Sequence, residues 1–100
     1  MHRVVFAPEA EEQLVALYLH IAEAASPEIA GNYTEAIVKQ CEGLRSIPPR
    51  GTRRNYIRPG LRTIGFRRRV TIAFSAVDEV VTVHGIYYGG QDFEKALDGE

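Results

Sequence analysis

Ser26, Pro27 and Glu28 mark the point where one helix is expected to end and the next to begin. Serine is a favoured N-cap, proline fits the first helical position, and an acidic residue is stabilised in the first turn. Apolar residues recur at helical spacing on both sides of this point: Leu14, Leu17, Tyr18, Ile21 and Ala25 before it, and Ala30, Tyr33, Ile37, Cys41, Leu44 and Ile47 after it. The short connection predicts an antiparallel helical hairpin over residues 8–47, ended by a proline pair, and each helix has one apolar face that must be covered.

The second half of the chain has the composition of β-strands. Residues 70–76 alternate apolar with smaller or polar side chains at period two, and residues 61–66 and 80–88 are rich in β-branched and aromatic residues. A short strand is also expected at residues 2–6. We therefore predict an α+β fold: an N-terminal strand, the helical hairpin, then a three-stranded antiparallel meander, with the helices on one face of the sheet. The predicted core takes apolar residues from both halves, namely Leu14, Leu17, Ile21, Tyr33, Ile37, Leu44, Val70, Ile72 and Phe74.

Length and composition restrict the class of protein. One hundred residues are enough for one small domain over residues 1–100. A hydrophobic content of 45 % with 25 % charged residues argues against intrinsic disorder. No apolar run reaches the roughly 18 to 20 residues that cross a bilayer, and the N-terminal apolar stretch is too short for a secretory signal. We expect a cytoplasmic protein without membrane contact.

Metal and cofactor sites have no support in the sequence. His2, His20 and His84 lie far apart, and none has a partner at the spacing of a metal ligand. Cys41 is the single cysteine, so neither a disulfide framework nor a cysteine zinc site is expected, and its helical spacing predicts a core residue. His20 falls away from the apolar face and is expected to face solvent. We predict no metal and no cofactor.

Eight arginines and no acidic residue lie between residues 50 and 69, whereas the net charge is −4 before this block and −5 after it. The arginines of the block are Arg50, Arg53, Arg54, Arg58, Arg62, Arg67, Arg68 and Arg69. Several fixed charges together hold a field that isolated charges lose to screening, so the block could bind phosphate, nucleic acid or an acidic protein segment. The structural alternative is a solvated strand edge whose arginines keep the protein soluble.

Three consecutive arginines stand at the connection between two predicted strands. Strand alternation would send Arg67 and Arg69 to one side and Arg68 to the other. The following strand adds an imidazole and two phenols: His84, Tyr87 and Tyr88. Such a group could bind a phosphate backbone, stack a base and assist proton transfer in RNA cleavage. The weak catalytic candidates are Arg67, Arg69, His84 and Tyr87. The structural alternative makes the tyrosines core aromatics with a wet hydroxyl and His84 a surface strand residue.

Four segments of the chain, taken in order, resemble those of a known family: VVFAPEA at residues 4–10, IPPRG at 47–51, LRTIGF at 61–66 and IYYGGQDFE at 86–94. Together they resemble the ParE branch of the RelE/ParE superfamily, the toxins of bacterial type II toxin–antitoxin modules. The last segment is similar to the closing strand of that family, where an aromatic residue or His, Gly, a variable residue, Arg or Gln, and Asp with an aromatic recur. Because the resemblance spans nearly the whole chain, it implies the same α+β fold.

Two activities occur in this superfamily, and the resemblance implies a choice between them. RelE-like members cleave mRNA on the ribosome, whereas ParE-like members inhibit DNA gyrase and have no established hydrolytic chemistry. Where RelE-like members place an Arg after the last strand and a Tyr or His near the C-terminus, this sequence has Gln91 and Leu97. Neither side chain can stabilise a phosphorane or move a proton. We predict a toxin that acts by binding, with DNA gyrase as its target. The alternatives are a ribosome-dependent mRNA endoribonuclease and a non-toxic antitoxin-binding module.

The resemblance also implies a partner. A cognate antitoxin encoded beside the gene would wrap the toxin with a partly disordered acidic tail, giving a hetero-oligomer. The arginine block is the expected acceptor for the acidic residues of that tail. The predicted contacts with target or antitoxin are Arg50, Arg53, Arg54, Arg58, Arg62, Arg67, Arg68, Arg69, Tyr88, Gln91, Asp92 and Phe93.

Overall fold

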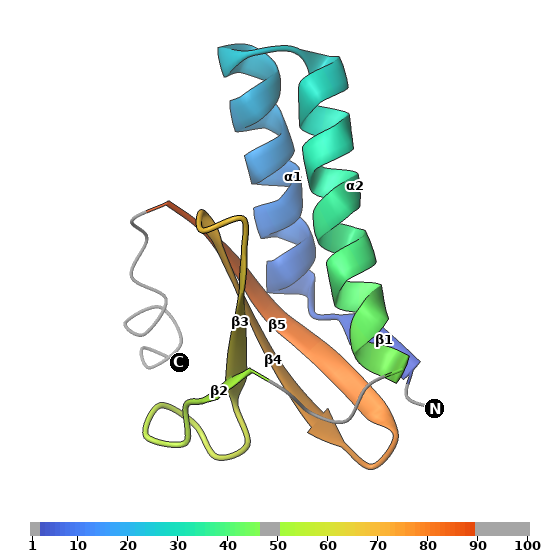
Figure 1. Cartoon of the computed structure of the whole chain (residues 1–100), viewed down its shortest axis with the longest axis vertical. Helices are drawn as coiled ribbons and strands as arrows, with labels where there is room; N and C mark the ends of the chain where they lie inside the picture. Colours follow the sequence, from blue (N-terminus) through green and yellow to red (C-terminus); the bar gives the residue numbers. More distant parts are fainter. Residues whose placement is uncertain (1–2, 47–50, 90–100) are drawn as a thin grey trace.

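A computed structural model of the chain describes residues 3–46 and 51–89, and its elements form a layer of helices and a twisted sheet (Figure 1). In chain order the elements are β1 (Arg3–Phe6), α1 (Pro8–Ala24), α2 (Pro27–Glu42), the 3-10 helix η1 (Gly43–Ser46), β2 (Thr52–Arg53), β3 (Arg62–Phe66), β4 (Val70–Val77) and β5 (Val80–Tyr88). Neither helix in these ranges is long and apolar enough to cross a membrane.

Both helices of the hairpin begin at a proline, as predicted. Pro8 and Pro27 occupy the first turns of α1 and α2, where a missing N–H leaves no hydrogen bond unmade. The Ser26 Oγ atom accepts a hydrogen bond from the Ile29 N–H at 3.1 Å, which confirms the predicted N-cap. The proline pair expected to end the hairpin lies outside the described residues.

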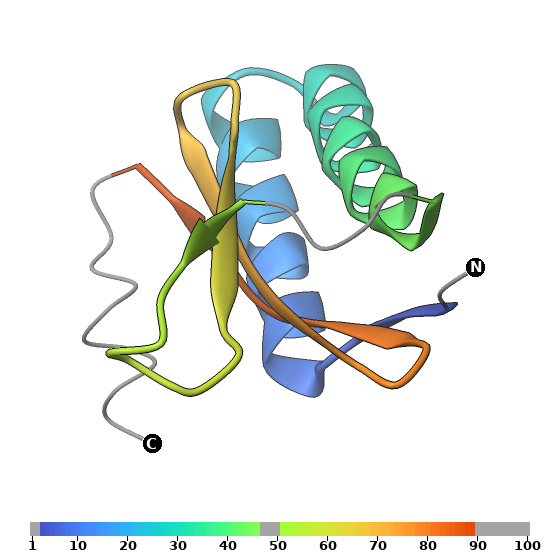
Figure 2. The same ribbon diagram turned by 60° about the horizontal axis from the view of Figure 1, so that its bottom comes forward.

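The sheet contains five strands in the order β1-β5-β4-β3-β2. Strands β3, β4 and β5 form the predicted antiparallel meander, and the helices cover one face (Figure 2). Strand β1 is parallel to β5, with Phe6 beside Val83, and β2 adds a short antiparallel edge beside β3. The α+β prediction is therefore confirmed, with the meander at the centre of a larger mixed sheet. Strand β2 was missed because two residues, Thr52 and Arg53, are too few to show a period.

The main core lies between the hairpin and the sheet. The predicted core residues Leu17, Ile37, Leu44, Val70, Ile72 and Phe74 are buried, and Leu14, Ile21 and Tyr33 are half-buried against the main cluster. Cys41 is fully buried, as predicted, and burial raises the pKa of its thiol to about 12. Ala25 is exposed, because α1 ends at Ala24 and the apolar stripe ends with it.

A second, smaller core lies on the sheet face away from the helices. Strand alternation puts Ala73 and Tyr87 on this face, and Leu61 packs against both, with Ile57 at the margin. Leu61 was expected to begin a strand, but β3 begins one residue later and Leu61 closes the β2–β3 loop, residues 54–61, onto the sheet. The sheet is therefore packed on both faces.

The pairing of β4 with β5 contains a bulge. Ala73 lies opposite Gly85 and Phe74 lies opposite Val83, so His84 has no partner residue in β4. A Cβ atom at Gly85 would overlap the phenol ring of Tyr87. The glycine therefore lets this ring lie across the strand and close the smaller core.

Candidate binding surfaces

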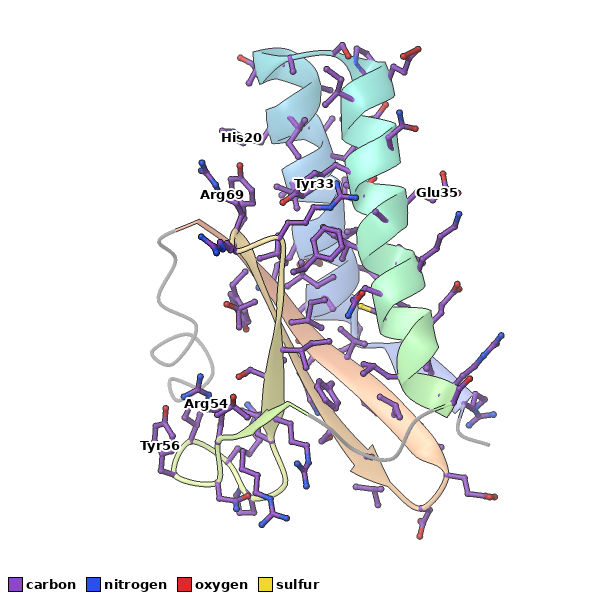
Figure 3. All side chains as sticks on the ribbon, viewed as in Figure 1. His20, Tyr33, Glu35, Arg54, Tyr56 and Arg69 are labelled. Atoms are coloured by element: carbon purple, nitrogen blue, oxygen red, sulfur yellow. The ribbon has the colours of Figure 1, made fainter. Side chains whose placement is uncertain are left out.

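Strand β3 divides the arginine block into two groups. At its end, Arg67, Arg68 and Arg69 form the β3–β4 connection, here called the arginine turn. The second group, here called the loop arginines, consists of Arg53, Arg54, Arg58 and Arg62. Figure 3 shows Arg69 and Arg54 at opposite ends of the sheet. Arg50 lies outside the described residues.

The arginine turn has a left-handed backbone. The Arg69 N–H donates to the Phe66 carbonyl oxygen at 3.2 Å and closes a four-residue turn. Its central residues, Arg67 and Arg68, have φ angles of 49° and 63°, a conformation that glycine and asparagine adopt most readily. Each non-glycine residue in this region costs about 1–2 kcal/mol. The alternation expected to separate Arg68 from its neighbours requires an extended backbone, which these residues do not have.

Arg67 covers one end of a row of rings. Its Cζ atom lies 4.8 Å from the Phe66 ring centroid and 5.6 Å from that of Tyr33, within the range of cation–π attraction. The rings of Phe66, Tyr33, Tyr88 and His20 follow one another at centroid distances of 5.7, 6.4 and 6.1 Å. These four rings, here called the aromatic row, come from β3, α2, β5 and α1. The row therefore ties the sheet to both helices beneath the arginine turn.

The Tyr33 hydroxyl is buried and has no hydrogen-bond partner within the described residues. Burial raises the pKa of Tyr33, and the neighbouring Tyr88 raises the pKa of Tyr33 further. The charges of Arg67 and Arg69 act in the opposite direction. An unpaired buried hydroxyl costs about 1–3 kcal/mol. The row thus contains one group that weakens the fold, next to the arginine turn.

A cleft opens beside the aromatic row, between α1 and the last part of β5. It has a volume of about 260 Å³ and is lined by Gln13, Ala16, Leu17, His20, Ile86 and Tyr88. His20 is exposed, as predicted, and Tyr88 is half-buried. Strand β1 ends opposite Val83, and further along β5 the Ile86 N–H donates to the Gln13 Oε1 atom at 2.7 Å. The cleft combines apolar walls with a few polar groups, the usual composition of a binding site.

The loop arginines make contacts within their own loop and strand. The Arg54 Nε atom donates to Thr63 Oγ1 at 3.0 Å, and its Nη1 atom donates to the Tyr56 hydroxyl at 3.2 Å. Arg53 and Arg62 are paired across β2 and β3, and two like charges in directly opposed positions destabilise a sheet. An anion placed between these two guanidinium groups would relieve the repulsion.

His84 and Ser75 form a polar pair on the sheet face away from the helices. The Ser75 Oγ and His84 Nε2 atoms are 2.7 Å apart. Burial lowers the pKa of His84 and the Arg58 charge lowers it further, whereas Glu9 acts in the opposite direction. Burial and the Arg58 charge thus both favour the neutral form of the imidazole. Tyr87 lies on the same face and is 7 % exposed.

The weak catalytic candidates do not converge on one site. Arg67 lies over Tyr33 on the helix side of the sheet, and Arg69 follows it in the same turn. His84 and Tyr87 belong to the opposite face. Within residues 3–46 and 51–89, no three or more His, Cys, Asp or Glu side chains are grouped closely enough to share a metal ion.

Three of the predicted contacts, Gln91, Asp92 and Phe93, lie outside the described residues. Conversely, sequence reasoning did not select Gln13 or Phe66 as site residues. The signal that could have identified the turn is a pair of arginines at hairpin positions where Asn-Gly is typical. Using that signal requires the strand register, which the sequence does not show directly.

A family comparison identifies the chain. The model of the family described as the ParE toxin of the type II toxin-antitoxin system, parDE, matches residues 4–93. The chain belongs to this family of ParE toxins. The resemblance carried by the four segments is thereby confirmed, and ParE toxins pair with the ParD antitoxin.

A solved structure has the same fold as this ParE toxin. A chain in the chromosomal ParDE toxin–antitoxin system from P. aeruginosa superposes with a TM-score of 0.77 at 24 % sequence identity. The alignment covers 89 % of this chain and 97 % of that chain. At this level of identity the likeness establishes the fold. A comparison of the sequence with curated proteins found no match.

Proposed function

We propose that this ParE toxin arrests growth by binding DNA gyrase rather than by catalysis, and that a cognate antitoxin with an acidic tail neutralises it. The separation of the candidate catalytic groups carries the proposal. Arg67 stacks on the helix side of the sheet, whereas His84 and Tyr87 lie on the other face. A guanidinium that stabilises phosphate must reach the same reacting centre as the general base. Groups divided between two faces favour binding over cleavage.

The exposed arginines support protein partners with acidic segments. Arg53, Arg68 and Arg69 are exposed, and a guanidinium can form paired, charge-assisted hydrogen bonds with a carboxylate. Such charges would also steer an acidic partner toward the arginines at low ionic strength. A hetero-oligomer of toxin and antitoxin is the expected resting form.

Induction of the toxin alone in a bacterium tests this function. Inhibition of gyrase predicts growth arrest with filamentation and DNA damage signalling, and coexpression of the antitoxin should restore growth. Purified toxin should also block the supercoiling of relaxed plasmid by purified gyrase. If growth never slows while soluble, folded toxin accumulates, the toxin mechanism is rejected and the domain is a non-toxic antitoxin-binding module.

A ribosome-dependent mRNA endoribonuclease is the second candidate, because one face of the sheet carries a histidine whose pKa is lowered toward the neutral form. His84 is paired with Ser75 and feels the charge of Arg58, and Tyr87 lies on the same face. Rapid mRNA loss on induction that disappears in His84→Ala but persists in Arg68→Ala would support cleavage. Intact mRNA during growth arrest would reject it.

A further inference from the structure

The sequence of the arginine turn conflicts with its backbone conformation. The other hairpin of the meander, between β4 and β5, places Asp78 at a φ of 56°, and aspartate is among the residues that tolerate this region. Arg67 and Arg68 both occupy left-handed positions without that tolerance. Strained backbone of this kind persists only where the surroundings enforce it, and it gathers at binding and catalytic sites.

Packing explains the position of Arg67 but not that of Arg68. Arg67 stacks over Phe66 and Tyr33. Arg68 and Arg69 are exposed, and neither side chain makes a hydrogen bond, ion pair or ring contact within the part of the chain that the structure describes. The turn therefore presents two guanidinium groups to solvent from a support fixed by the aromatic row.

The aromatic row connects the arginine turn to the α1–β5 cleft. Tyr88 contacts Tyr33 within the row and lines the cleft together with His20. The Gly89 N–H donates to the Arg69 carbonyl oxygen at 2.7 Å, which fixes the turn beside the end of β5. Figure 3 shows His20, Tyr33 and Arg69 gathered at the same end of the molecule. Cationic groups and an apolar cleft are thus neighbours on one surface.

The rings of the row are poorly placed to stack nucleotide bases. The Tyr33 ring meets Phe66 and Tyr88 edge to face, at interplanar angles of 88° and 83°, and Arg67 covers it. Binding of single-stranded nucleic acid relies on aromatic faces that bases can cover. Tyr33 and Phe66 instead form a packed support, so the groups that contact a ligand come from the arginine turn and from the cleft, which His20 and Tyr88 line.

Charge along α1 also disfavours a phosphate backbone. Glu9 is four residues before Gln13, and Glu23 is three residues after His20, so helical spacing puts both exposed carboxylates on the face of α1 that lines the cleft. A nucleic acid carries a charge at every nucleotide and would be repelled there. A polypeptide can place carboxylates only at the arginine turn and apolar side chains in the cleft.

We infer that the arginine turn and the α1–β5 cleft together form the anchor site for an acidic, amphipathic segment of the antitoxin. Arg68 and Arg69 each pair with a carboxylate, and the cleft receives an apolar side chain. This inference rests on the proposed function, because it takes the antitoxin as the partner. The left-handed turn holds Arg68 in its binding position before the partner arrives, so less conformational entropy is lost on association.

Arg68→Gly separates the strain of the turn from its charge. Glycine adopts the left-handed conformation freely, so the variant should melt about 4 °C above the wild type, as expected for a domain of this size. It should nevertheless bind the full-length antitoxin encoded beside the gene at least tenfold more weakly, because one charge-assisted pair is lost. Ala16→Leu, which fills the cleft from α1, should weaken binding without changing the turn.

Asp78→Gly is the matched control, because it relieves a left-handed residue in the other hairpin without touching an arginine. It should bind the antitoxin as the wild type does. Arg68→Lys keeps the charge and loses the planar fork, so its affinity should fall between the wild type and Arg68→Gly. Isothermal titration calorimetry gives the affinities and thermal unfolding gives the melting temperatures.

An Arg68→Gly variant that melts higher and keeps full affinity would reject the anchor site and leave the proposed function standing. Wild-type toxin that fails to bind the antitoxin would reject the proposed function itself. Analytical ultracentrifugation tests whether a second copy of this chain occupies the anchor site. Titration with an oligoribonucleotide tests whether nucleic acid binds there instead. Dimerisation or RNA binding that Arg68→Gly abolishes would overturn the inference in favour of that occupant.

Discussion

The two arginine groups differ in what their guanidinium groups contact. Arg54 is hydrogen-bonded to Thr63 and Tyr56, whereas Arg68 and Arg69 make no such contact within the described residues. Four residues of β3, Thr63 to Phe66, separate the groups by roughly 13 Å of extended chain. One run of positive charge therefore contains both arginines that organise a loop and arginines available to a partner.

Leu61→Ala should have the largest effect on the loop side of the comparison. Leu61 is 1 % exposed and holds the β2–β3 loop against Ala73 and Tyr87, so its truncation should lower the free energy of unfolding by about 3 kcal/mol. Val77→Ala is the control, because Val77 is 68 % exposed and its truncation should cost less than about 0.5 kcal/mol. Urea unfolding measures both, and equal effects would show that the loop is not packed on the sheet.

Arg54→Ala should have the next largest effect, because it breaks the hydrogen bonds to Thr63 and Tyr56. We expect a loss of about 1–2 kcal/mol in the free energy of unfolding. The neighbouring Arg53→Ala should be neutral or slightly stabilising, since it removes the like charge opposite Arg62. Chemical unfolding of the two variants side by side tests the distinction. If Arg53→Ala lowers the free energy of unfolding as much as Arg54→Ala does, the hydrogen bonds of Arg54 do not account for its contribution to stability.

Tyr33→Phe should stabilise the support of the arginine turn. The substitution removes a buried hydroxyl that has no partner within the described residues and keeps the ring against Phe66 and Tyr88. A gain of about 1 kcal/mol is expected, measured by thermal unfolding. A lower melting temperature would mean that the hydroxyl is hydrogen-bonded in solution.

Titration of His84 should give the smallest effect. Its folded-state pKa lies below the ordinary value of 6.5, so the unfolded chain binds the proton more readily. The stability that neutral His84 contributes is complete above pH 6.5. It is lost as the pH falls from 6.5 toward the lowered pKa of the folded state. His84→Gln removes the titration and can keep a hydrogen bond to Ser75, so its stability should change less between about pH 7 and 5. Parallel pH profiles for the two proteins would contradict this.

The helical hairpin was predictable because its signals are local. Ser26 and the two prolines specify helix starts within a few residues, and the apolar stripe repeats along each helix. The order of strands in the mixed sheet was harder to predict from the sequence. The parallel pairing of β1 with β5 joins the two ends of the described chain, and no local pattern specifies which strands become neighbours.

The site was predictable in composition but not in arrangement. The arginine block is visible as charge, yet its division depends on where β3 begins and ends. The contact of Arg67 with Tyr33 depends on how α2 packs against β3, and helical spacing placed Tyr33 in the core without indicating that contact. The left-handed conformation of Arg68 is imposed by the hairpin register, against its own preference.

Because β5 lies between β1 and β4, the last strand described is an interior strand of the sheet. At ~5–20 residues per second, roughly 4–15 s pass between the synthesis of Phe6 and that of Val83, its neighbour in the sheet. During this interval β1 has no strand partner, and α1 lacks the strand that it covers in the finished fold. A message truncated anywhere before β5 therefore yields a polypeptide that cannot fold into a toxin.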